Sequence, residues 1–213
     1  MSQGYLIGVD IGTYSSKGVI VRPDGSVIAS DTQPHGLDMP RPGFVEHDAD
    51  KVWWHDFVTI VRNLLQKTGV KPKEILAIGT SAIGPCVLPI DDHGNPLRPA
   101  ILYGIDTRAT REIKYLERQL GRDTIFKISG LNLSSQASGP KILWIRNHEP
   151  EVYKRARWFL TSEAYLVYKL TGKTSIDIYT AASYAPLYNT TMQKWDKQAA
   201  DWITPLDLSL IHI

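Results

Sequence analysis

The first 80 residues alternate short apolar runs with turns in an order that few folds accommodate. Three apolar runs between residues 5 and 30 are too short for helices, and turn-forming residues separate them. A longer segment, from about residue 48 to Gly69, repeats apolar residues at helical spacing, and a run at 75–81 predicts a buried strand. This order predicts an α/β fold in which helices flank a mixed sheet.

The rest of the chain continues with a further strand and several helices, and no linker divides it. We therefore expect residues 1–213 to form one domain. The expected elements are a strand at 87–90, a helix from Asp106 or Thr107 to Leu120, short helices at 141–147 and 151–157, and a longer helix at 162–170.

Composition narrows the functional class. The net charge is +2 and no run of Lys or Arg is present, so we expect no nucleic-acid partner. No apolar stretch approaches the roughly 20 residues that span a bilayer, so we expect no membrane partner. Cys86 is the one cysteine, and the N-terminus does not read as a secretory signal. Together these features favour a cytoplasmic location.

A loop of small and polar residues, 10–17, joins the first two predicted strands. Gly12 allows a tight turn and a close approach to a ligand, and Lys17 adds a positive charge. Asp10 would repel phosphate unless it faces Mg²⁺, usually through water. The loop therefore suits phosphate binding, although a plain hairpin turn is the alternative, because small polar residues are common turn formers. Further hydroxyl donors in the loop are Thr13, Ser15 and Ser16.

This loop resembles the first phosphate motif of the actin, Hsp70 and sugar-kinase superfamily. Other segments resemble the FGGY carbohydrate kinases, the group that includes xylulokinase and glycerol kinase. The resemblance runs in order along nearly the whole chain and implies a ribonuclease H-like N-terminal domain, paired with a similar C-terminal domain and with ATP between them. The matching segments are 42–48 followed by Trp53 and Trp54, 97–103 leading into Asp106 and Arg108, 141–148, and 165–172 with 177–183.

The resemblance implies ATP-dependent phosphorylation of a sugar or polyol hydroxyl. It places Mg²⁺ at Asp10 through water and the phosphates of ATP at Asp10, Gly12, Thr13, Ser15, Ser16 and Lys17. It lines the sugar site with Ser81, Ile83, Gly84, Tyr103, Asp106 and Arg108.

The family's general base is an aspartate in a Gly-Asp segment near the start of the second domain. The aspartates after Asp177, at positions 196, 201 and 207, do not follow glycine. We therefore expect the base beyond residue 213, an inactive isolated chain, and a missing C-terminal domain as its partner. Whether the complete protein forms a homodimer stays open.

Two segments depart from the xylulokinase pattern. Residues 83–85 read Ile-Gly-Pro where xylulokinases carry Gln-Met-His, and residues 103–106 read Tyr-Gly-Ile-Asp where many relatives carry Trp-Asn-Asp. Polar groups that would bind sugar hydroxyls are missing, so we do not expect xylulose as the substrate. A non-catalytic sugar- or nucleotide-sensing module of the same fold is the alternative function.

Several residues have a structural interpretation beside the functional one. Asp106 is placed either to cap a helix or to contact substrate, and Arg108 either at the surface or in the sugar site. A nuclease of ribonuclease H type would need clustered carboxylates for two metal ions, and only Asp10 stands at a strand end near the loop. The helical spacing of Trp53, Trp54 and Trp144 favours the core over sugar stacking.

Overall fold

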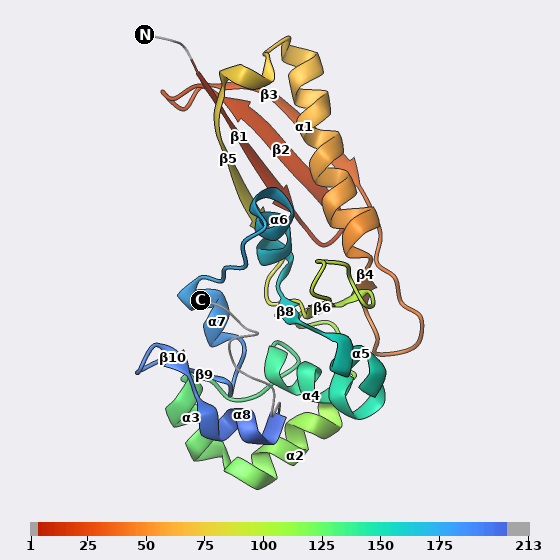
Figure 1. The fold of residues 1–213 in the computed structure, drawn as a ribbon, viewed down its shortest axis with the longest axis vertical. Helices are drawn as coiled ribbons and strands as arrows, with labels where there is room; N and C mark the ends of the chain where they lie inside the picture. The colour runs from red at the N-terminus through yellow and green to blue at the C-terminus, as the bar shows by residue number, and fades with distance from the viewer. Residues whose placement is uncertain (1–3, 204–213) are drawn as a thin grey trace. The chain divides into compact units, whose positions relative to one another are not determined.

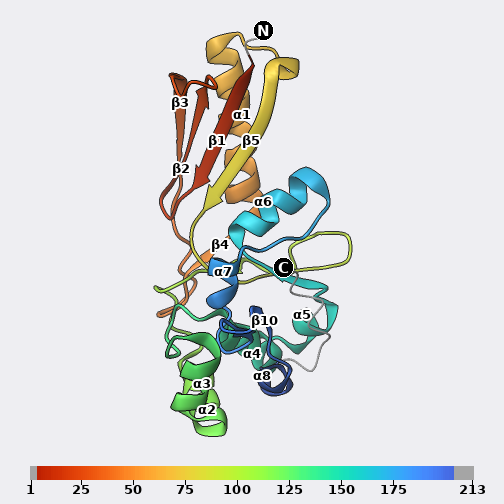
Figure 2. The same cartoon turned by 90° about the vertical axis from the view of Figure 1, so that its left-hand side faces the viewer.

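The computed structural model describes residues 4–203, whose contacts divide into two compact units (Figures 1 and 2). Among these residues, unit 1 comprises 4–37 and 48–83, and unit 2 comprises 38–47 and 84–203. The extent of the predicted family domain over 1–213 stays a prediction. Within residues 4–203, none of the helices has the length and apolar character needed to cross a membrane.

A four-stranded sheet in the order β3-β2-β1-β5 forms the frame of unit 1 (Figure 2). β1 lies in the middle, antiparallel to β2 and parallel to β5. The predicted mixed sheet is therefore confirmed. The bounds are β1 (Tyr5–Ile11), β2 (Ser15–Val21), β3 (Val27–Pro34) and β5 (Ile75–Ala82).

One face of this sheet is covered by α1 (His55–Thr68) (Figure 1). The Asp48 carboxylate accepts hydrogen bonds from the Asp50 and Lys51 amides and caps the π-helical turn η1 (Ala49–Trp54), which continues into α1. Gly69 ends α1 in the left-handed conformation, with φ at 69°. The predicted helix and both of its ends are thus confirmed. Its buried apolar residues include Trp53, Phe57, Ile60 and Leu64.

β5 follows a short 3₁₀ turn, η2 (Pro72–Glu74), and forms the edge of the described sheet. Leu76 is 60% exposed and Ile78 is 40% exposed, so the prediction of a buried strand is wrong about burial. The physical reason is that Ile78 lies opposite Ile7 on the α1 face of the sheet, but α1 packs mainly on β1, β2 and β3 and leaves the edge strand β5 largely uncovered. Apolar composition predicts a strand but does not say what packs on it.

Helices and short strand pairs make up unit 2. The strand pairs are β4 (Glu46–His47) with β7 (Ala100–Ile101), β6 (Leu88–Ile90) with β8 (Trp158–Leu160), and β9 (Tyr188–Asn189) with β10 (Lys194–Trp195). The helices are α2 (Thr110–Leu120), α3 (Arg122–Ser129), α4 (Ser138–His148), α5 (Pro150–Arg155), α6 (Ser162–Thr171), α7 (Ile178–Ala182) and α8 (Lys197–Ile203).

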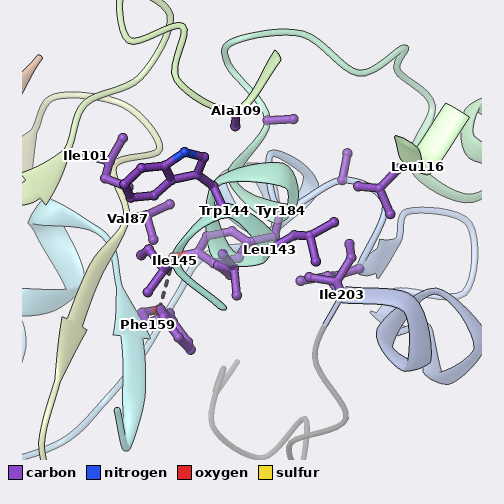
Figure 3. Close-up of a cluster of buried hydrophobic side chains, with 14 of the residues drawn as sticks. Val87, Ile101, Ala109, Leu116, Leu143, Trp144, Ile145, Phe159, Tyr184 and Ile203 are labelled. Carbon is purple, nitrogen blue, oxygen red and sulfur yellow. Dashed lines mark hydrogen bonds between the residues drawn. The ribbon is translucent and has the colours of Figure 1, made fainter. Parts of the chain in front are cut away.

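α4 lies at the centre of the unit 2 core (Figure 3). Leu143, Trp144 and Ile145 are all buried, so this helix packs against neighbours on every side instead of along one stripe. The Tyr184 hydroxyl donates a 3.1 Å hydrogen bond to the Phe159 carbonyl, which satisfies that buried group. Burial of Trp144 here and of Trp53 in unit 1 confirms core positions for these two tryptophans.

Close packing between β2 and α1 depends on Gly18. A Cβ at this position would lie 2.3 Å from Ile60 Cγ2 and 3.2 Å from the Gly8 carbonyl oxygen. We expect Gly18→Ala to lower the free energy of unfolding by about 1–3 kcal/mol in urea denaturation, because the core would be overpacked. Gly79→Ala, whose Cβ would meet nothing within 4 Å, is the control. Equal stability of the two variants would contradict this packing.

Candidate functional site

The turn between β1 and β2 is tight and specific for glycine. The Gly12 amide donates a 3.0 Å hydrogen bond to the Ser15 carbonyl, which closes the hairpin. A Cβ on Gly12 would lie 2.7 Å from the same oxygen, so a larger residue would push the turn open. The side chains of Thr13 and Ser15 are half-buried at this turn, and Tyr14 is exposed.

Strand register brings three of the predicted site residues into one row. Asp10 lies opposite Lys17 on β2 and opposite Ser81 on β5. Directly paired residues project from the same face of a sheet, so all three side chains point to the face away from α1. All three are exposed. The sheet therefore gathers a carboxylate, an ammonium group and a hydroxyl beside the Gly12 turn.

A hollow of about 380 Å³ lies on the same sheet, lined in part by Asp10, Lys17 and Ser81. Gly8 and Gly79 are register partners on β1 and β5 and also line it. Because neither glycine carries a side chain, the backbone of both strands stays accessible to a ligand lying on the sheet.

Ser16 does not join this row. It pairs with Ile11, is fully buried, and points toward α1, where its hydroxyl donates a 2.7 Å hydrogen bond to Asp56 Oδ2. The alternation of strand side chains separates Ser16 from its neighbours Ser15 and Lys17. The structure thus divides the loop residues between the two faces of the sheet.

The predicted sugar-site residues are divided between the units: Ser81 and Ile83 belong to unit 1 and the other four to unit 2. In unit 2, Gly84 lies against the Tyr103 ring, since a Cβ there would come within 3.4–3.6 Å of ring carbons. Asp106 and Arg108 are buried, and their side chains contact protein groups.

Arg108 is the centre of a buried ion cluster. Its guanidinium group pairs with Glu46 and Asp106 at 2.7 Å each, and it lies 4.0 Å from the centre of the Phe44 ring. The Asp106 carboxylate also accepts a 2.7 Å hydrogen bond from the Val45 amide. These bonds attach the segment 44–46 to the residues just before α2. Asp106 does not cap that helix, which begins at Thr110 after Ala109.

Lys141 has a structural role that local sequence patterns do not indicate. Its buried ammonium group donates hydrogen bonds to the Leu102 carbonyl at 2.8 Å and the Ser135 carbonyl at 2.6 Å. Ser135 in turn bonds Gly104 twice, through its carbonyl at 3.1 Å and its hydroxyl at 2.6 Å. Lys141 therefore fixes the loop that presents Tyr103. A basic residue within the apolar run 141–145 was the available signal.

A second hollow, of about 360 Å³, lies in unit 2 beside this loop. Its polar lining comes mainly from the stretch between α3 and α4, which sequence reasoning did not single out. The signal was a short run of amide and hydroxyl residues directly before an apolar helix. Lining residues with hydrogen-bonding side chains are Asn132, Ser134, Gln136, Tyr179 and Ser183.

The Arg108 cluster predicts a large stability effect. Arg108→Met would leave the buried Glu46 and Asp106 carboxylates without their cation, and we expect it to cost about 3–5 kcal/mol in urea unfolding. Arg122→Met is the matched control, because Arg122 is 72% exposed in its pair with Glu117 and should cost at most about 1 kcal/mol. Similar losses for both variants would contradict a buried cluster.

Lys141 predicts a pH dependence of stability. Burial lowers its pKa from 10.5 to about 8, so between those values the folded protein releases a proton that the unfolded chain keeps. Lys141 therefore raises the free energy of unfolding as pH rises from about 8 to 10.5, by up to about 3 kcal/mol. Lys141→Met should remove that rise in unfolding curves measured across this range, whereas exposed Lys154→Met should keep it.

Three kinds of comparison place this chain among known proteins. The model of the FGGY family of carbohydrate kinases, N-terminal domain, matches residues 5–210. A glycerol kinase from Listeria monocytogenes is 33% identical over 205 residues, covering 93% of this chain and 41% of the relative. A xylulose kinase from Staphylococcus xylosus is 29% identical over 197 residues, covering 91% and 39% respectively.

Among solved structures, the ligand-bound xylulose kinase from Lactobacillus acidophilus superposes with a TM-score of 0.87 at 26% identity, over 99% of this chain and 42% of that one. The sugar-kinase fold of the actin and Hsp70 superfamily is thereby confirmed. The chain spans about two fifths of the length of the curated relatives it matches. By these matches, the chain belongs to the FGGY family of carbohydrate kinases and corresponds to its N-terminal domain.

Proposed function

We propose that the protein containing this chain transfers the γ-phosphoryl group of ATP to a hydroxyl of a sugar or polyol. The observation that carries the proposal is the row of Asp10, Lys17 and Ser81 beside the Gly12 turn, in a chain of this kinase family. Phosphoryl transfer needs little covalent chemistry from the protein. It needs positioned donors and charge around the transferred group, and this row supplies both.

In this proposal the turn residues bind the phosphates. The backbone amides near Gly12 and the hydroxyls of Thr13 and Ser15 donate hydrogen bonds, and Lys17 adds a positive charge that favours the phosphate anion. The Ser16 hydroxyl is engaged by Asp56, so we assign it no direct phosphate contact.

The donor set also fits Mg²⁺ held through water. Asp10 offers one exposed carboxylate, and within residues 4–203 no three His, Cys, Asp or Glu side chains are grouped to bind a metal directly. An ion that keeps several waters and takes few carboxylates suits such a site. When bound, Mg²⁺ would neutralise charge that develops on the phosphates.

The acceptor alcohol would bind in unit 2. We propose Gly84 and Tyr103 as lining residues, with the amides and hydroxyls of the 360 Å³ hollow as further hydroxyl-binding groups. Ser81 and Ile83 belong to unit 1, and their place in the sugar site stays a prediction. The buried Asp106–Arg108 pair would support this site without binding the acceptor, since both side chains are occupied by protein partners. The proton of the acceptor hydroxyl would pass to a carboxylate beyond residue 213.

An acceptor panel tests the proposal. The protein expressed from its complete reading frame is assayed for ADP formation from MgATP with glycerol, xylulose, gluconate and a wider set of polyols and ketoses. We expect saturable turnover with at least one acceptor. Binding of an acceptor or nucleotide without any turnover would instead support a sensing module and overturn the kinase proposal.

Asp10 gives the sharper test within that assay. We expect Asp10→Asn to lower kcat by at least about 100-fold, because a charge that organises the phosphates is lost, while the thermal midpoint stays within a few degrees. Asp24→Asn is the matched control in unit 1, since Asp24 lies in the turn after β2, at the end of that strand away from Lys17, and accepts hydrogen bonds from Ser26. An unchanged rate for Asp10→Asn would remove Asp10 from the site.

A further inference from the structure

A buried network of three side chains lies on the α1 side of the proposed phosphate loop. Ser16 Oγ donates to Asp56 Oδ2 at 2.7 Å, and His35 Nδ1 lies 2.8 Å from the same oxygen. The other ring nitrogen, His35 Nε2, lies 3.0 Å from the Gly12 carbonyl oxygen. A serine of β2, an aspartate of α1 and a histidine directly after β3 therefore converge on the turn.

The network is well shielded from water. Ser16 is fully buried, and the side chains of His35 and Asp56 are 7% and 8% exposed. Hydrogen bonds in such a setting are strong and hold one geometry. Buried ion pairs, however, seldom add net stability over apolar side chains of the same size. Stability alone therefore does not account for a buried polar network at this place.

Both nitrogens of the His35 ring face atoms that accept hydrogen bonds. Asp56 Oδ2 belongs to a carboxylate and the Gly12 oxygen to a carbonyl, so both contacts are donated when the imidazole carries two protons. One contact joins the ring to a carboxylate of α1, and the other joins it to the backbone of the turn. The backbone amide of His35 also donates to the Tyr14 carbonyl at 3.0 Å, a second bond to the same turn.

Holding the Gly12 carbonyl has a geometric consequence. In a trans peptide the C=O and the following N–H point in opposite directions, so a carbonyl aimed at His35 aims the Thr13 amide away from it. Within residues 4–203 the Thr13 amide has no hydrogen-bond acceptor. An amide fixed in direction and lacking a protein acceptor is a ready donor for a phosphate oxygen.

We propose that His35, anchored by Asp56 and Ser16, is a positioning residue that fixes the Gly12–Thr13 peptide for binding the phosphates of ATP. The inference rests on the proposed kinase function but assigns roles to residues beyond the loop itself. His35 acts through the backbone of the loop and does not touch ATP. Ser16 then contributes from the buried face, through Asp56, rather than as a phosphate ligand.

Two substitutions separate the contacts of His35. The amide nitrogen of Asn overlays Nδ1 of His, so His35→Asn keeps the bond to Asp56 and loses the bond to Gly12. The amide nitrogen of Gln reaches the place of Nε2, so His35→Gln keeps the bond to Gly12. His93→Asn, at an exposed turn histidine, is the control.

The first measurement is steady-state kinetics of the complete protein with an acceptor that the wild type phosphorylates. We expect His35→Asn to raise the KM for ATP about tenfold and to leave the KM for the acceptor within about twofold, as loss of one hydrogen bond predicts. His35→Gln should stay within about threefold of wild type. Equal changes in both KM values, or an unchanged KM for ATP in His35→Asn, would overturn the proposal.

The second measurement is amide hydrogen exchange in the peptide that contains residues 12–15, which needs no activity. We expect about tenfold faster exchange in His35→Asn and near wild-type exchange in His35→Gln, because only the first variant releases the turn. An unchanged exchange rate in His35→Asn would show that His35 does not hold the Gly12–Thr13 peptide and would overturn the proposal. If the wild type phosphorylates no acceptor, the kinase function fails while the exchange result still decides whether His35 holds the loop.

Discussion

The pairing of β1 with strands on both sides is the constraint on which the proposed phosphate site depends. Antiparallel pairing with β2 and parallel pairing with β5 set the register that aligns Asp10, Lys17 and Ser81 in one row. A shift by one residue would turn every side chain of a strand to the other face of the sheet. The apolar residues Ile7, Val9 and Ile11 oppose such a shift, because they are buried against the α1 face.

The same register distributes chemistry to the two faces of the sheet. On one face, charged and hydroxyl groups border a hollow. Gly8 and Gly79 line it, and because they lack side chains, the strand backbone there is accessible. On the other, Ser16 meets Asp56 and His35, and the network reaches back to the Gly12 carbonyl. The turn between β1 and β2 is thus held from the buried face, and in the proposed function its amides and side chains bind phosphate on the open face.

Unit 2 depends on a different interaction, the buried pairing of Arg108 with Glu46 and Asp106. It attaches the segment Asp38–His47 to unit 2, although the chain before and after that segment belongs to unit 1. Lys141 plays a related part, since it holds the Leu102 and Ser135 carbonyls and with them the loop that carries Tyr103. In both cases a buried cationic side chain holds together segments that are distant in sequence.

Much of the local structure could be predicted because its causes are local. The Asp48 cap and the Gly69 terminus of the first helix follow from the side chain and backbone of single residues. The tight turn at Gly12 likewise follows from the absence of a Cβ. The start of α2 was expected at Asp106 or Thr107 but lies at Thr110, because the Asp106 carboxylate bonds Arg108 and Val45 instead of the free amides of a helix.

The sequence by itself determined the order of strands and helices, the turn at Gly12 and the family pattern, since these depend on neighbouring residues and on spacing. Only the tertiary structure decided that Ser16 is buried with Asp56, 40 residues away, and that His35 reaches the Gly12 carbonyl. It also decided that the β5 strand is largely exposed in this chain. The physical reason is common to all three: the environment of a side chain is set by strand register and by partners distant in sequence, which local spacing does not encode.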